Sequence, residues 1–131
     1  MSRINWMKEL GWTDEHVEDL RFAGYSYIRQ GKYDIALPFF EALAALKTDS
    51  AYDAQTLGAI YLQIGKPKDA IKCFDKALKS ESDHTPTLLN LTKALLMLGK
   101  KEEALKLAEL LSKESNPQIS NMAKALLLAF G

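Results

Sequence analysis

Cysteine is almost absent from this chain of 131 residues, because Cys73 is the single one, and no disulfide can form within the chain. Glycine and proline are also scarce, with seven and four residues, which argues against disordered or low-complexity tracts. Seventeen basic residues balance seventeen acidic ones, so no excess of charge favours nucleic acid or direct membrane binding. The apolar runs are far shorter than the roughly 18 to 20 residues that span a bilayer, and the first residues lack the apolar core of a secretory signal. We therefore expect a cytoplasmic location.

Residues suited to catalysis are equally scarce. The two histidines, His16 and His84, lie far apart in the sequence, and neither a phosphate-binding loop nor a dinucleotide-binding motif occurs. Cys73 precedes Phe74 in a segment of helical pattern, where a small buried thiol is favoured over a nucleophile. We therefore expect no enzyme activity, no cofactor and no metal site.

The feature that the chain does contain is a repeat. Gly31, Gly65 and Gly99 fall 34 residues apart, and each follows a segment in which apolar residues recur at helical spacing. Three alanines recur with the same period: Ala36, Ala70 and Ala104. This pattern predicts one helix pair per period, with the glycine ending the first helix of each pair. Because one such unit cannot bury its own apolar face, neighbouring units are expected to stack.

The apolar periodicity and the start and stop residues predict an all-α fold with seven helices. Whether a short helix precedes them is left open. The predicted helices cover residues 14–30, 33–47, 51–64, 67–80, 85–98, 101–114 and 117–130.

The repeat resembles that of the tetratricopeptide family over about residues 17–118. The second unit carries the family pattern as Leu57, Gly58, Tyr61, Gly65, Ala70, Phe74 and Ala77. The first unit carries it as Leu20, Gly24, Tyr27, Gly31, Tyr33, Ala36 and Phe40. The third unit departs from it, because Thr92 replaces the glycine and Ala108 replaces the phenylalanine.

The resemblance implies a right-handed superhelical stack of three helix pairs plus a C-terminal capping helix, within a single domain of residues 1–131. Its predicted parts are an N-terminal extension of residues 1–16, repeats of residues 17–50, 51–84 and 85–118, and a capping helix of residues 119–131.

Within this family, the chain is similar to the cytoplasmic chaperones of bacterial type III secretion. The similarity lies in its size, its three repeats, the lead-in from Gly11 to Glu15, and the string YSYIRQGKYDIALPFFEALAAL of residues 25–46. It implies a chaperone that binds an aggregation-prone export substrate, either a needle subunit or a translocator, in its concave groove. The alternative is a generic tetratricopeptide scaffold that joins proteins in a stable complex.

In this family the first helix of each pair forms the concave wall, which implies a partner-binding groove. The residues expected to line it are Arg21, Tyr25, Ile28, Tyr52, Gln55, Ala59, Leu62, Leu89, Lys93 and Leu96. Their largely apolar character suits an extended peptide with spaced apolar anchors or an amphipathic helix, and both forms of client stay open. Repeats that hold the C-terminal carboxylates of heat-shock chaperones present more cations than Arg21 and Lys93 offer, which argues against that role.

The N-terminal extension is strongly apolar, and a lone helix could not bury its two tryptophans. It either folds back on the first repeat or meets a second subunit, as in a homodimer or a complex with a second small co-chaperone. The residues expected at this interface are Trp6, Met7, Leu10 and Trp12.

Overall fold

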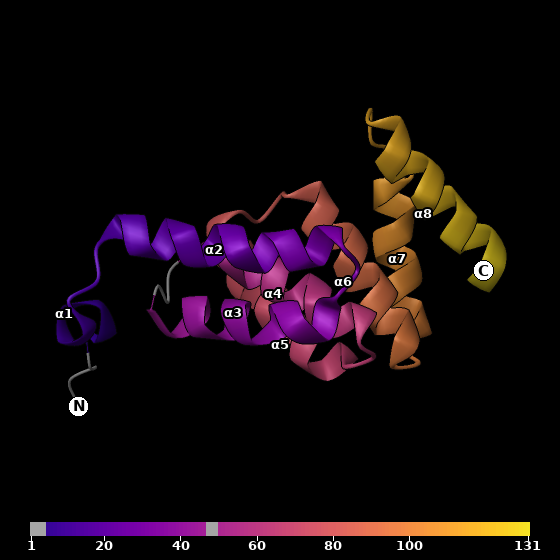
Figure 1. Cartoon of the computed structure of the whole chain (residues 1–131). Helices are drawn as coiled ribbons and strands as arrows, with labels where there is room; N and C mark the ends of the chain where they lie inside the picture. Colours follow the sequence, from indigo (N-terminus) through magenta and orange to yellow (C-terminus); the bar gives the residue numbers. More distant parts are fainter. Residues whose placement is uncertain (1–4, 47–49) are drawn as a thin grey trace.

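The computed structural model describes residues 5–46 and 50–131, and this part of the chain folds into helices without any strand (Figure 1). The helices are α1 (Trp6–Leu10), α2 (Asp14–Arg29), α3 (Tyr33–Leu46), α4 (Ala51–Gln63), α5 (Pro67–Ser80), α6 (Thr85–Met97), α7 (Lys101–Leu111) and α8 (Pro117–Phe130). The all-α fold predicted from the sequence is therefore confirmed, and α1 is the short helix that the sequence left open. Residues 1–4 of the predicted extension, and residue 47 at the predicted end of the second helix, lie outside the described residues. None of the described helices is both long enough and apolar enough to cross a membrane.

From α2 onward, the helices form a stack in which each packs mainly on the next along the chain. α2 pairs with α3, α4 with α5 and α6 with α7, while α8 packs on α7 and α6 at the C-terminal end (Figure 1). α4 also packs against α6, so α4, α6 and α8 lie side by side. At the other end, α1 packs against α3. The stack therefore places the first helices of successive pairs along one wall.

Each first helix stops at a glycine in the left-handed region of backbone conformation. The φ angle is 73° at Gly31, 79° at Gly65 and 77° at Gly99. A residue with a side chain would cost roughly 1 kcal/mol or more in this conformation. The predicted role of these glycines as helix stops is therefore confirmed.

The two helices of a pair approach most closely where a glycine of the first faces a phenylalanine of the second. A methyl group placed on Gly24 would lie 2.8 Å from Cε2 of Phe40, and one placed on Gly58 would lie 2.5 Å from Cε1 of Phe74. Both phenylalanine side chains are fully buried. The glycines are therefore required because the opposing ring occupies the space of a side chain.

The third pair reverses the sizes of these two residues. Thr92 stands one period after Gly58, Ala108 stands one period after Phe74, and both are fully buried. The Thr92 hydroxyl donates a hydrogen bond to the backbone oxygen of Leu88, at 2.8 Å, so it leaves no unpaired polar group inside. The third pair therefore has the larger residue on its first helix and the smaller one on its second.

Gly58→Ala is expected to lower the free energy of unfolding by about 1 to 3 kcal/mol, because the new methyl group would overlap the Phe74 ring. In a Phe74→Ala background the overlap with the ring is removed, and Cβ of Cys73, at 3.1 Å, is the close contact that remains. The same change should then cost much less or be neutral, since alanine favours a helix over glycine by about 1 kcal/mol. Urea denaturation of the wild type, both single variants and the double variant measures these values. An equal loss in both backgrounds would contradict the assigned overlap.

Candidate peptide-binding surface

A cavity of about 240 Å³ lies between α2 and α4. The structure brings four of the predicted groove residues together in its lining: Tyr25, Ile28, Gln55 and Ala59. Four residues that were not predicted for the groove complete the lining: Tyr33, Thr56, Ile60 and Gln63. Gln63 follows Ala59 by one helical turn on α4, so helical spacing alone could have identified it.

A second cavity, of about 340 Å³, lies between α6 and α8. The predicted residues Lys93 and Leu96 line it together with Met97, Leu126 and Phe130. The contribution of α8 was missed, because the repeat pattern presents the last helix only as a cap. Within the described part of the chain Lys93 forms no ion pair, so this cavity combines an apolar lining with one ammonium group.

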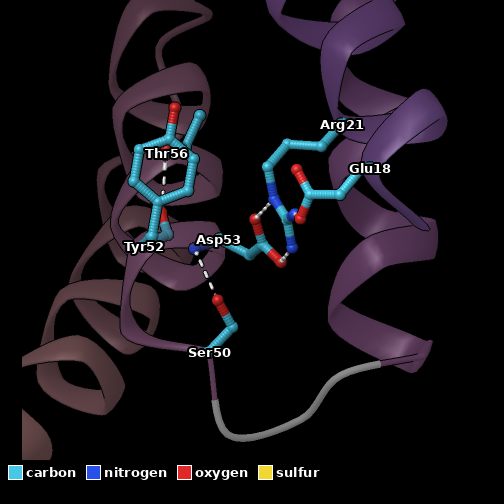
Figure 2. Close-up of polar contacts among 6 residues, drawn as sticks. All are labelled: Glu18, Arg21, Ser50, Tyr52, Asp53 and Thr56. Atoms are coloured by element: carbon cyan, nitrogen blue, oxygen red, sulfur yellow. Dashed lines mark hydrogen bonds and ion pairs between the residues drawn. The ribbon is translucent and has the colours of Figure 1, made fainter. Parts of the chain in front are cut away.

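Arg21 of α2 is bound to Asp53 of α4, as Figure 2 shows. Its Nε donates to Oδ1 of Asp53 at 2.8 Å, and a terminal nitrogen donates to Oδ2, also at 2.8 Å. Glu18, one turn earlier on α2, pairs with the same guanidinium. The hydrogen bonds to Asp53 are the largest cause that raises the pKa of Arg21 above its ordinary value, while burial opposes them. Arg21 is therefore occupied within the chain, although it was predicted as a partner-binding residue.

Tyr52 lies beside this ion pair on α4, and 47% of its surface is exposed (Figure 2). Partial burial of the phenol is the main cause that raises its pKa, and the nearby phenol of Tyr25 raises it further. Tyr25 is itself 42% exposed and lines the cavity between α2 and α4. The two tyrosines thus form an aromatic, exposed surface next to that cavity.

Two of the predicted groove residues pack against core clusters, Leu89 fully and Leu62 in part. Leu89 is only 8% exposed and lies in a core cluster with Leu111, Ile119 and Ala123. Leu62 is half-buried against the cluster of Ala70, Phe74 and Ala94. Leu89 therefore belongs to the core between α6, α7 and α8, because α8 covers the face on which it stands.

The apolar residues near the N-terminus divide into two groups. Met7 and Trp12 pack against the core cluster that contains Val17. Trp6 and Leu10 remain 46% and 53% exposed. The first group folds back on the first helix pair, whereas the second leaves an apolar surface on α1.

The residues with reactive side chains lie apart. Burial raises the pKa of the Cys73 thiol to about 11, which disfavours the reactive thiolate. Among the described residues, no group of histidine, cysteine, aspartate and glutamate side chains could hold a metal ion. The arrangement offers apolar cavities with polar rims, which suit the binding of a polypeptide.

Helix pairs of 34 residues, glycine stops and glycine–phenylalanine contacts define a tetratricopeptide repeat protein. The family model described as anaphase-promoting complex, cyclosome, subunit 3 matches residues 29–111. The chain therefore belongs to the protein family that this model describes. The matched range runs from the end of α2 to the end of α7. A comparison with curated protein sequences finds no match.

Solved structures with the same fold include chaperones of type III secretion. The Pseudomonas aeruginosa protein PcrH, in complex with the chaperone binding region of PopD, is 22% identical with a TM-score of 0.75, covering 92% of this chain and 94% of that one. The Yersinia enterocolitica chaperone SycD, with a peptide of the translocator YopD, is 21% identical with a TM-score of 0.79, covering 90% and 94%.

The same fold also occurs in a repeat domain that is not a secretion chaperone. The second repeat domain of human RPAP3, in complex with an HSP70 peptide, is 23% identical with a TM-score of 0.72, covering 85% of this chain and 91% of that one. At these identities the likeness establishes a common fold.

Arg21→Met is expected to lower the free energy of unfolding by about 3 kcal/mol, because it leaves the carboxylate of Asp53, with 1% of its side chain exposed, without its partner. Arg21→Met combined with Asp53→Leu removes both charges and should recover most of that loss. Glu18→Gln serves as the control, since the Glu18 side chain is 70% exposed and its loss should cost about 1 kcal/mol or less. Urea denaturation measures all four proteins, and an Arg21→Met variant as stable as Glu18→Gln would contradict the assigned role.

Cys73 is expected to react slowly with iodoacetamide at pH 8. A pKa of about 11, against an ordinary value of 9.0, leaves about 100-fold less thiolate in the folded protein than in the unfolded chain. Because the folded pKa is raised, the rate should climb about tenfold per pH unit up to pH 11. Mass spectrometry follows the alkylation, with the denatured chain as control. A folded rate at pH 8 equal to the denatured rate would refute this prediction.

Proposed function

We propose that this protein is a type III secretion chaperone that binds an aggregation-prone export substrate on the wall formed by its first helices. The client is a needle subunit or a translocator, and it binds without nucleotide and without covalent chemistry. Covering the client's apolar surface would prevent its premature assembly in the cytoplasm.

The observation that carries this proposal is the pair of apolar cavities, one between α2 and α4 and one between α6 and α8. Two separate cavities suit a client segment with two large apolar side chains spaced along its length. The exposed rings of Tyr25 and Tyr52 add contact area that a client would cover at small entropic cost.

The shared fold supports the same proposal. PcrH and SycD have the fold of this chain and were solved with segments of PopD and YopD. RPAP3 has it with an HSP70 peptide, but Arg21 in this chain is neutralised by Asp53 and Glu18, so the cations for a terminal carboxylate are fewer than the sequence suggested. These contacts favour an apolar client over an acidic peptide terminus.

We further propose that the repeats span residues 17–50, 51–84 and 85–118 after an extension of residues 1–16, and that residues 119–131 act as the cap. Trp6 and Leu10, both exposed on α1, are the proposed contacts for a second subunit, either another copy or a small co-chaperone.

The proposal is tested by co-expressing the chain with the needle subunit and with the translocators of the same organism. We expect one of these subunits to become soluble in a fixed-ratio complex, measured by size-exclusion chromatography with light scattering. Ala59→Glu, which places a charge in the cavity between α2 and α4, should abolish the complex. Ala42→Glu, on an exposed position of α3, is the matched control and should leave the complex intact.

Failure of every subunit to co-purify, or equal loss with both variants, would refute the chaperone function. The alternative, a scaffold in a stable complex, predicts a different fate for the chain. A scaffold would co-purify with the finished assembly, whereas a chaperone would remain in the cell when its client is exported. Immunoblotting of purified secretion assemblies and of culture supernatants distinguishes the two.

A further inference from the structure

A second surface lies on α7, away from the wall of first helices. A shallow depression of about 830 Å³ is lined by Leu127 of α8 and by five residues of α7: Glu102, Leu105, Lys106, Glu109 and Leu110. Leu110 is 66% exposed, and Leu128, next to Leu127, is 87% exposed. The proposed client site does not include this surface, so Leu110 and Leu128 remain exposed to water.

The charges on this face of α7 alternate in a regular order. Glu102, Lys106, Glu109 and Lys113 are spaced by four, three and four residues, so they follow one stripe along α7 and just beyond its end. All four are exposed, and none forms an ion pair within the described part of the chain.

This order of charges is complementary to itself when two copies of α7 run antiparallel. Lys106 of each copy then faces the partner's Glu109, and Glu102 faces the partner's Lys113. Leu105 and Leu110 flank the stripe on its two sides. A parallel arrangement would instead set each residue against its own copy, with like charges facing each other. The charges therefore favour one orientation.

The equivalent face of α5, one period earlier, lacks this property. Its corresponding residues are Lys68, Lys72, Asp75 and Lys79, and Lys76 takes the place of Leu110. In the same antiparallel arrangement Lys68 would face the partner's Lys79, which is repulsive. The self-complementary stripe is thus specific to the last pair and is no consequence of the repeat.

We propose that this face of α7 binds a second copy of the chain, in a two-fold symmetric antiparallel dimer. The contact covers Leu110 of each copy, and no residue of α7 lines either cavity of the client site. Exposed ion pairs contribute little individually, so the dimer is weak and depends on protein concentration and on salt. The net charge of zero removes the overall repulsion that would oppose it.

The test is sedimentation equilibrium of the full chain at low salt, over micromolar to millimolar concentrations. Lys106→Glu alone and Glu109→Lys alone should each weaken self-association by about tenfold or more, because each sets like charges against each other twice. An equimolar mixture of these two variants should form a heterodimer, and the double variant Lys106→Glu/Glu109→Lys should regain self-association. The controls are Lys72→Glu and Asp75→Lys, at the same positions of α5, which should associate like the wild type.

A wild-type chain that stays monomeric at all concentrations would overturn the proposal. So would single variants that associate as well as the wild type, or controls that lose association to the same degree. All the substituted positions are exposed, and circular dichroism verifies that each variant is folded. Client binding by the same variants is a separate measurement, so a failed dimer leaves the proposed chaperone function standing.

Discussion

The close approach of two helices within each pair is the constraint on which the rest of the structure depends. Phe40 and Phe74 are fully buried only because Gly24 and Gly58 leave room for their rings. In the third pair, the larger residue, Thr92, stands on the first helix and the smaller one, Ala108, on the second, and both are fully buried. Because a protein interior is close-packed, the size of the residue on one helix limits the size of its counterpart on the other.

Sequential packing leaves two kinds of exposed surface. The first helices contribute to the cavities between α2 and α4 and between α6 and α8, where apolar side chains accompany a few polar groups. The outer face of α7 carries alternating charges with leucines beside them. No residue lines both surfaces, although α8 contributes Leu127 to the depression on α7 and Leu126 and Phe130 to the cavity between α6 and α8.

The two halves of the wall of first helices differ in their charged groups. α2 and α4 are joined by the bidentate contact of Arg21 with Asp53, which neutralises a guanidinium that would otherwise attract an anion. Lys93, at the cavity between α6 and α8, has no such partner within the described residues. In one half of the wall two carboxylates surround the guanidinium of Arg21 beside exposed tyrosine rings, whereas the cavity in the other half has one ammonium group among apolar side chains.

The period of 34 residues determined the number of helix pairs, their bounds to within about three residues and the glycine stops, because these depend on local conformation and on spacing along the chain. The side-chain environments depended on residues far away in the sequence. Arg21 reads as a free cation until the fold places Asp53 against it, and Leu89 reads as a groove residue until α8 covers it. Tyr25, Ile28, Gln55 and Ala59 were predicted on one wall, but only the tertiary structure decided that they enclose a cavity with Tyr33 and Gln63, since that volume lies between two helices.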